Sequence, residues 1–274
     1  MVKVITVCTD TKHYFPYLKD TCKRFGGEFV VLGYNEAWRG YKWKFEKMVE
    51  YLSTLEKEEL VVFVDGYDVI CIRDLTTLND LYKSIKDIHS CKLVIAHETV
   101  TFPVVGSFLT QFLKFYYGSK NNISINAGTY AGFAEDVLYV LKNAIRIFPT
   151  ENDDQRLIIN YANISGNQIY IDTNRDFFFT DVTYLQKFVI PKDTNPYFIH
   201  AAACGDLTDV LINMGYTVDS NLIDDNKKLL STKAIYHTKA FVSILLTQHI
   251  FTILLVILLL IVILMRIRHK KYHL

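Results

Sequence analysis

Two aspartates stand at the end of an apolar run in the first quarter of the chain. The run is Leu60–Val64, and Asp-Gly-Tyr-Asp follows it at positions 65–68. A continuous apolar run predicts a parallel strand buried on both faces, and ligands of open α/β sheets bind beyond the carboxyl ends of such strands. Carboxylates are the ligands that Mg²⁺ or Mn²⁺ prefers, and such an ion commonly takes substrate phosphates in its other positions. Asp65 and Asp68 therefore predict a metal site for a nucleotide or sugar diphosphate, although a turn capped by Asp65 explains these four residues equally well.

The apolar pattern predicts alternating strands and helices around this pair. Strands are expected at 2–7, 29–32, 60–64, 93–96, 169–172 and 197–200, and helices at 15–25, about 45–55, 75–88, 136–147 and 154–161. Such alternation is typical of βαβ units and predicts a mostly parallel sheet. Because no repeat or proline-rich linker interrupts it, residues 1–235 are expected to form one α/β domain.

The C-terminal part of the sequence predicts a membrane anchor. Residues 241–265 contain no Asp, Glu, Lys or Arg, and about 20 apolar residues suffice to cross a bilayer. A basic tail, residues 266–274, follows with four Lys or Arg. Subtracting these four from the formal net charge of +1 leaves −3 for the rest, which is not the charge balance of a nucleic-acid-binding protein.

Two features of the sequence disagree about the side of the membrane on which the large domain lies. The run Val2–Val7 is too short for a secretory signal, and five scattered cysteines without a CxxC motif favour a reduced compartment. Both favour a single-pass protein whose catalytic domain faces the cytosol. The positive-inside rule instead would keep the basic tail in the cytosol and place the domain across the membrane.

The order of short motifs resembles the glycosyltransferase domain of the collagen lysyl hydroxylases. The motifs are ITVCT at 5–9, VLGYNEAWRG at 31–40, FVDGYD at 63–68, INAGTYAG at 125–132, NDDQ at 152–155 and YFIH at 197–200. Each motif alone is weak, and their shared order over nearly the whole domain carries the resemblance. It implies a GT-A fold, which is a Rossmann-like nucleotide-diphospho-sugar transferase fold, together with a Mn²⁺ cofactor and a UDP-sugar donor.

By the same resemblance Asp65, Asp68 and His200 are the metal ligands. Two carboxylates and one imidazole leave room for two diphosphate oxygens, and the ion would neutralise charge that builds on the UDP leaving group. A lone histidine at the end of an apolar strand is more often structural, so the assignment of His200 depends on the resemblance.

The residues expected to bind the donor are Thr9, Asp10, Trp38, Lys42, Phe45, Tyr67 and Gly205. Thr9 and Asp10 follow the first strand, where the ribose or base lies in this architecture, and the Tyr67 ring is placed to stack on uracil. Lys42 and Phe45 fall where the family has a donor-site lysine and a nearby aromatic. The alternatives are a helix cap, packed rings and an ordinary lysine-rich helix start.

On the acceptor side the resemblance selects Asn126, Asp153 and Asp154 as catalytic residues. The two aspartates would hold the acceptor nucleophile or support positive charge developing on the sugar. Acidic residues also favour the N-terminus of a helix, and that structural reading of Asp153 and Asp154 is equally good.

Two segments depart from the family pattern. The family histidine is followed by Gly-Asn-Gly and a lysine, whereas here three alanines and Cys204 lie between His200 and Gly205, so the loop that embraces the diphosphate is altered. Thr-Phe-Pro at 101–103 stands where the family has a tryptophan before a proline, which indicates a different sugar preference.

Together these features predict a membrane-anchored, Mn²⁺-dependent glycosyltransferase. It would move glucose or galactose from a UDP-sugar to a hydroxyl acceptor on a protein or glycan, such as hydroxylysine or galactosyl-hydroxylysine of a collagen-like protein. One alternative is a catalytically inert, membrane-anchored module that binds nucleotide-sugars or a partner. A phosphatase of the haloacid dehalogenase class is disfavoured because it needs a second aspartate where Tyr67 stands.

Overall fold

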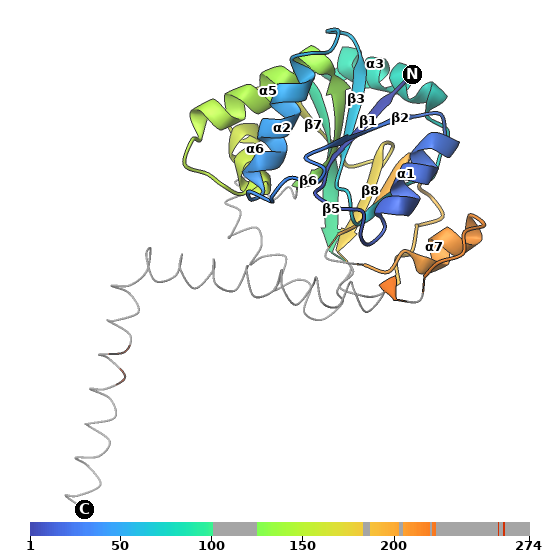
Figure 1. Cartoon of the computed structure of the whole chain (residues 1–274). Coiled ribbons are helices and arrows are strands. Elements are labelled where there is room, and N and C mark those ends of the chain that lie inside the picture. Colours follow the sequence, from blue (N-terminus) through green and yellow to red (C-terminus); the bar gives the residue numbers. More distant parts are fainter. Residues whose placement is uncertain are drawn as a thin grey trace, which may run out of the picture. The chain divides into compact units, whose positions relative to one another are not determined.

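The computed structural model of the chain describes residues 1–100, 125–182, 187–202, 205–219, 221, 222, 257 and 260. The chain divides into two compact units, Met1–Lys227 and Lys228–Leu274. The named helices and strands all lie in the first unit (Figure 1). They are β1 (Lys3–Val7), α1 (Phe15–Arg24), β2 (Glu28–Leu32), α2 (Lys42–Leu52), β3 (Leu60–Val64), β4 (Val69–Cys71), η1 (Leu75–Thr77), α3 (Leu78–His89), β5 (Leu93–Val100), β6 (Ile125–Phe133), α5 (Ala134–Ile147), α6 (Asp154–Ala162), η2 (Gly166–Gln168), β7 (Ile169–Asp172), β8 (Phe178–Val182), β9 (Phe198–Ala202) and α7 (Thr208–Asn213).

The predicted anchor, residues 241–265, and the tail, residues 266–274, lie outside the described residues apart from Ile257 and Leu260, which are helical. Within the part of the chain that the structure describes, no helix combines the length and apolarity needed to span a bilayer. The anchor therefore stays a prediction.

The strands form one nine-stranded mixed sheet in the order β2-β1-β3-β6-β5-β8-β9-β4, with β7 paired to β5 beside this path. Parallel pairs join β1 to β2 and β3, β5 to β7 and β8, and β8 to β9. The expectation of an α/β domain is confirmed, but β6 runs antiparallel to β3 and β5, and β4 runs antiparallel to β9. The sequence analysis expected none of β4, β6 and β8 as strands.

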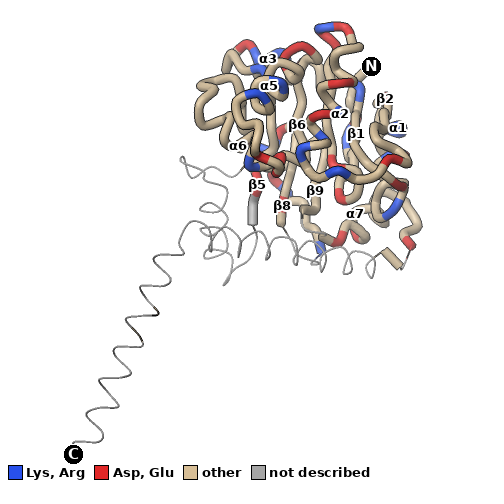
Figure 2. The backbone as a smooth tube through the Cα atoms, turned by 60° about the vertical axis from the view of Figure 1, so that its left-hand side comes forward, with Lys and Arg blue, Asp and Glu red and all other residues tan. Residues whose placement is uncertain are grey.

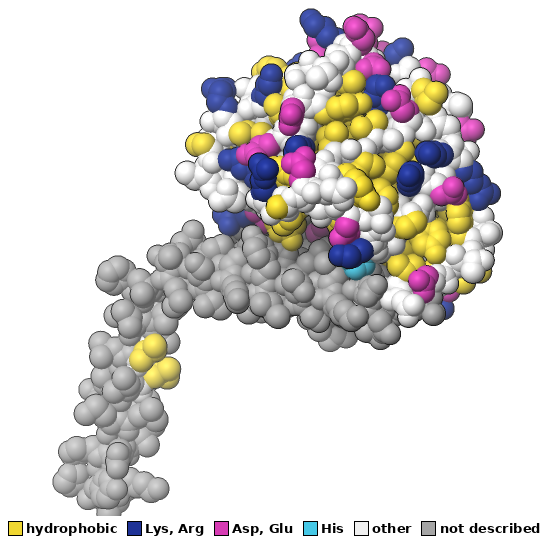
Figure 3. Space-filling model, in the orientation of Figure 1, with side chains coloured by type: hydrophobic (Ala, Val, Ile, Leu, Met, Phe, Trp, Pro, Cys, Tyr) yellow, Lys and Arg dark blue, Asp and Glu magenta, His cyan; other side chains and the backbone are white. Residues whose placement is uncertain are grey.

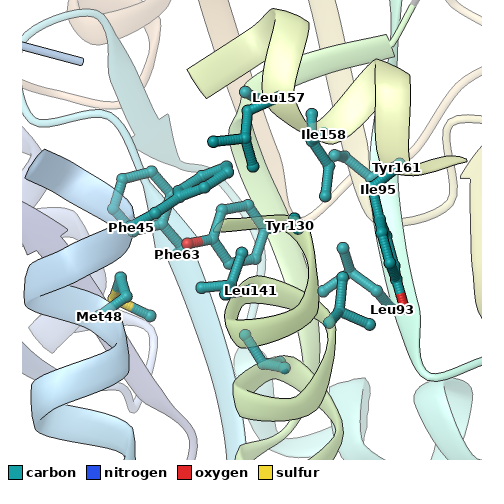
Figure 4. Close-up of a cluster of buried hydrophobic side chains, with 14 of the residues drawn as sticks. Phe45, Met48, Phe63, Leu93, Ile95, Tyr130, Leu141, Leu157, Ile158 and Tyr161 are labelled. Carbon is teal, nitrogen blue, oxygen red and sulfur yellow. The ribbon is translucent and has the colours of Figure 1, made fainter. Parts of the chain in front are cut away.

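Helices cover both faces of the sheet (Figure 1). The first hydrophobic cluster joins α2, α5 and α6 to one face, and the second joins α1 and α3 to the other. In the first cluster the Tyr130 ring stacks on Phe63 at a centroid distance of 4.8 Å and meets the edge of Phe45 at 6.1 Å (Figure 4). Fully burying side chains of this size contributes about 1.5–3 kcal/mol each, so these aromatics hold α2 firmly against the sheet.

A glycine allows the centre of the sheet to pack closely. A Cβ at Gly132 would lie 2.7 Å from the Lys92 carbonyl oxygen and 2.9 Å from Val137, so a side chain there would collide with both β5 and α5. In the same region Asp136, buried in the first turn of α5, pairs with Lys86 and with Lys92, whose ammonium lies 2.9 Å away. These pairs balance a buried charge and link α5 to α3.

Charged residues of both signs are interspersed along the described elements (Figure 2). Hydrophobic side chains gather on the face of the first unit that Figure 3 shows, over the region of α1 and β2.

Candidate active site

The structure brings Asp65, Asp68 and His200 together. Asp65 directly follows β3, and its backbone N–H donates to the Gly128 carbonyl over 2.7 Å. Asp68 precedes β4, and His200 lies on β9 opposite Val69 because β4 and β9 pair in an antiparallel register. One ligand atom from each of the three side chains lies within 4.8 Å of the other two. The end of β3, the residue before β4 and the middle of β9 thus build one cluster of two carboxylates and an imidazole.

The donor set and its surroundings fit a divalent metal ion. His200 is 3% exposed, its Nε2 lies 3.3 Å from Asp68 Oδ1, and its Nδ1 has no hydrogen-bond partner among the described residues. A Cβ at Gly128 would lie 2.5 Å from His200 Cε1 and 2.7 Å from Asp65 Oδ2, so glycine keeps the space between these groups open. Two carboxylates and one imidazole are a donor set that can hold a divalent metal ion.

A buried lysine links this cluster to the N-terminus of α6. The Lys44 ammonium lies 2.7 Å from Asp65 Oδ1 and 2.7 Å from Asp154 Oδ2. Burial alone would lower the pKa of Lys44, but the carboxylates of Asp154 and Asp65 outweigh burial and leave it raised. The lysine is therefore charged and holds the two carboxylates at fixed positions. Sequence reasoning missed Lys44, although a lysine four positions before buried Met48, on an apolar helix face, was a usable signal.

The two neighbouring aspartates of α6 have different roles. Asp153 is the N-cap, and its Oδ1 accepts the backbone N–H of Arg156 over 3.0 Å. Asp154 is 5% exposed and meets Lys44. Burial raises the pKa of Asp154 to about 6 in spite of that ammonium. The capping interpretation thus describes Asp153, whereas Asp154 belongs to the charged site.

Asn126 lies in the same region and is oriented by two hydrogen bonds. Its Nδ2 donates to Glu98 Oε2 over 2.7 Å, and its Oδ1 accepts the Gly128 N–H over 2.8 Å. Burial raises the pKa of Glu98, while hydrogen bonds from Asn126 and Gln155 and the proximity of His200 oppose that shift. Sequence reasoning also missed Glu98, whose signal was an acid within the apolar strand β5.

The expected donor residues after β1 also lie together. The Tyr67 hydroxyl accepts the backbone N–H groups of Thr9 and Asp10, each over 3.3 Å. The close approach of the two loops needs Gly66, because a Cβ there would lie 3.0 Å from the Cys8 side chain. Thr9, Asp10 and Tyr67 therefore form one structural unit with the loop that carries Asp65 and Asp68.

The remaining expected donor residues are more dispersed. Trp38 is 48% exposed and makes edge contacts with other aromatic rings of the same loop and of α2. The Lys42 ammonium donates to the Pro149 carbonyl over 2.7 Å, and Phe45 is fully buried in the core. Gly205 follows β9, and its N–H donates to the Ala201 carbonyl over 3.0 Å. The structure thus gives Phe45 a packing position and directs Lys42 to a loop carbonyl, while Lys44 is the lysine that meets the carboxylates.

Residues 1–207 match the family model described as the PLOD GT domain. The chain belongs to this family of glycosyltransferases. The matched region contains every residue of the site just described. The resemblance seen in the motif order is therefore confirmed at the level of the family.

Two curated relatives contain similar sequence. The chain is 26% identical over 162 residues to a multifunctional procollagen lysine hydroxylase and glycosyltransferase of Caenorhabditis elegans, a match that covers 56% of this chain and 21% of that protein. It is 26% identical over 154 residues to a procollagen-lysine,2-oxoglutarate 5-dioxygenase of Drosophila melanogaster, which covers 53% and 20% respectively. The glycosyltransferase chain thus matches about a fifth of the length of these relatives.

Among solved structures, one similar chain is a glycosyltransferase involved in the glycosylation of the major capsid of PBCV-1. The superposition has a TM-score of 0.41 and 13% sequence identity, and covers 73% of this chain and 94% of that chain.

Proposed function

We propose that this glycosyltransferase is a Mn²⁺-dependent hexosyltransferase that moves glucose or galactose from a UDP-sugar to a hydroxyl acceptor. The observation that supports it is the cluster of Asp65, Asp68 and His200 beside the Lys44–Asp154 ion pair. In such a transfer a metal ion stabilises the departing diphosphate, and an acidic group supports the sugar or the acceptor. Both groups are therefore needed in one site.

In this proposal Asp65, Asp68 and His200 would hold the ion. When bound, Mn²⁺ would act as a Lewis acid that neutralises charge on the departing diphosphate. Lys44 keeps the carboxylate of Asp65 in one position, and the Asp65–Gly128 backbone hydrogen bond holds the start of the loop. The buried His200 ring is kept in place by the pairing of β4 with β9. These groups need little rearrangement when the donor arrives.

Transfer forms a bond between the acceptor oxygen and the anomeric carbon of the sugar. The bond from that carbon to the UDP oxygen breaks, its electron pair stays on the diphosphate, and the acceptor hydroxyl releases its proton to solvent. In this proposal Asp154 would support positive charge on the sugar; the support is that Lys44 holds its carboxylate beside the ligand cluster. Asn126 and Glu98 form a second, hydrogen-bonded polar pair near the start of β6 and the end of β5.

The acceptor class in this proposal is hydroxylysine or galactosyl-hydroxylysine of a collagen-like protein. It is supported by the relatives, whose names give procollagen lysine hydroxylation and glycosyl transfer. We also propose that residues 241–265 anchor the enzyme in a membrane, with the catalytic domain facing the cytosol; the supports are the uncharged C-terminal segment and the five scattered cysteines without a CxxC motif.

The experiment is UDP release and sugar transfer by the full chain with UDP-glucose and with UDP-galactose, in the presence and absence of Mn²⁺. The variants Asp65→Ala and His200→Ala remove ligands, and Asp80→Ala and His89→Ala are matched controls on exposed positions of α3. Mn²⁺-dependent turnover that disappears only in the first two variants supports the proposal. UDP binding with no turnover on any acceptor would instead support an inert nucleotide-sugar-binding module.

A further inference from the structure

Glu151 organises the segment that leads into α6. Its Oε1 accepts the backbone N–H groups of Asn152 and Asp153 over 3.0 and 3.1 Å. Its Oε2 lies 3.1 Å from Arg156 Nε, and the Glu151 side chain is 18% exposed. Hydrogen bonds to an ionised acceptor are stronger than those to a neutral one. The Glu151 carboxylate therefore holds this segment at three points.

These bonds support the cap of α6. Asp153 is the N-cap residue, and its Oδ1 accepts the Arg156 N–H over 3.0 Å. Arg156 therefore has one carboxylate at its backbone and the Glu151 carboxylate at its guanidinium. With Asp153 engaged as the cap, the next residue, Asp154, is the one whose carboxylate reaches Lys44 at 2.7 Å. The position of Asp154 thus depends on how the first turn of α6 is held.

The same segment is bonded to the start of α2. The Lys42 N–H donates to the Asn152 carbonyl over 3.1 Å, and the Lys42 ammonium donates to the Pro149 carbonyl over 2.7 Å. Two residues further along α2, Lys44 meets Asp154. The starts of α2 and α6 are therefore joined twice, by bonds to the segment before α6 and by the buried ion pair.

We propose that Glu151 is a positioning residue for sugar transfer, because its carboxylate fixes the first turn of α6 and so places Asp154 beside Lys44 and the ligand cluster. This inference rests on the proposed function, in which Asp154 supports charge on the sugar. Glu151 acts only through the backbone and the guanidinium that it binds. A misplacement of about 1 Å in an active site can lower a rate roughly 100-fold, so a loosened first turn would slow transfer.

Two substitutions separate the parts of this carboxylate. Glu151→Ala removes the acceptor of both N–H groups. Glu151→Gln keeps an oxygen acceptor of the same reach and removes the charge that faces Arg156. The matched control is Asp74→Ala, because Asp74 Oδ1 accepts the Thr76 N–H over 2.8 Å at the turn before α3. That variant also removes a capping carboxylate, but from a turn that carries none of the site residues.

The test uses the full chain and two measurements on each variant. Hydrogen exchange of the peptide 152–156 reports on the first turn of α6 without ligand. Release of UDP from UDP-glucose and from UDP-galactose with Mn²⁺ gives kcat per folded molecule and the donor KM. We expect Glu151→Ala to speed this exchange and to lower kcat about tenfold, with the donor KM within about twofold of the wild type. Glu151→Gln should keep kcat within about threefold, and Asp74→Ala should leave both measurements unchanged.

A double variant tests whether Glu151 acts through Asp154. If it does, Glu151→Ala should lower kcat by no more than about twofold in a chain that already carries Asp154→Asn, because the two losses have one cause. A residue that only supports the fold would give losses that multiply.

Multiplied losses in the double variant would overturn the positioning of Asp154 by Glu151. An unchanged kcat in Glu151→Ala, or a raised donor KM without loss of kcat, would also overturn it. So would an equal loss in Glu151→Gln, because the charge rather than the held backbone would then matter. If the wild type itself releases no UDP with Mn²⁺, the proposed function fails and this inference falls with it, whereas normal release by the wild type and full kcat in Glu151→Ala would overturn this inference alone.

Discussion

The Lys44 ammonium lies 2.7 Å from Asp154 Oδ2 at a site where both side chains are less than 10% exposed. The same ammonium lies 2.7 Å from Asp65 Oδ1. A single buried cation therefore links the cluster of Asp65, Asp68 and His200 to the N-terminus of α6. Replacing Lys44 by methionine keeps an unbranched side chain one atom shorter and removes this link. Because the Asp154 carboxylate would then be buried without a partner, we expect the free energy of unfolding to fall by about 3–5 kcal/mol and transfer by roughly 100-fold.

The control for Lys44→Met is Lys47→Met, one turn further along α2, where the lysine pairs with Glu36 at 2.6 Å and is partly exposed. Loss of that pair should lower the free energy of unfolding by about 1 kcal/mol or less. The double variant Lys44→Met, Asp154→Asn should regain part of the stability lost in Lys44→Met, because it no longer buries the uncompensated charge of Asp154. Chemical denaturation and turnover per folded molecule measure both effects. Full transfer by Lys44→Met would show that the buried ion pair has no part in the reaction.

The ionisation of Asp154 is expected to determine how the rate of transfer falls at acid pH. Burial raises its pKa to about 6, so transfer should fall as the pH drops below about 6 and Lys44 loses one charged partner. The folded-state pKa lies above the ordinary value of 3.8, so the folded chain takes up this proton before the unfolded chain does. Between pH about 6 and 4 this protonation therefore favours the folded chain, and activity should be lost before the chain unfolds. Rates and melting temperatures recorded together across this range measure it, and an unchanged acid limb in Asp154→Asn would assign the limb to another group.

A side chain at position 128 is expected to weaken metal binding selectively. Gly128→Ala would bring a Cβ to within 2.5 Å of the His200 ring and 2.7 Å of Asp65, so these ligands must move apart. Gly132→Ala, on the same strand, would clash with a backbone oxygen of Lys92 at 2.7 Å but away from the metal cluster. Both variants should be less stable, and only Gly128→Ala should weaken Mn²⁺ binding in calorimetry. Equal Mn²⁺ affinities in the two variants would separate Gly128 from the metal site.

Two substitutions of Glu98 are expected to differ in their effect on the stability of the fold. Glu98→Ala leaves the Asn126 Nδ2 without its acceptor at 2.7 Å, which should cost about 1–3 kcal/mol of unfolding free energy. Glu98→Gln keeps an oxygen acceptor of the same reach and should cost less. Urea denaturation of both variants tests this, and equal costs in the two variants would show that the Glu98 charge, rather than its hydrogen bond, supports the fold.

Much of the frame and the central cluster follow from the sequence, because they depend on local pattern and motif order. The sequence predicted the apolar strand before Asp65 and the strand that carries His200. The structure brings these two side chains together. Strand β6 was not foreseen, since its alanines and glycines lack the bulky alternation of a typical strand, and β4 has only three residues. Tertiary packing also decided which lysine of α2 reaches the carboxylates: Lys44 faces inward, and Lys42 faces a loop carbonyl.

The most direct test of the central claim is Mn²⁺ binding to the full chain in the presence of UDP, measured by electron paramagnetic resonance. The claim is that Asp65, Asp68 and His200 form one metal site that serves a UDP-sugar. It predicts one UDP-dependent Mn²⁺ signal in the wild type and in Asp80→Asn, and its loss in Asp65→Asn and His200→Gln. A signal that persists unchanged in both ligand variants would contradict the claim.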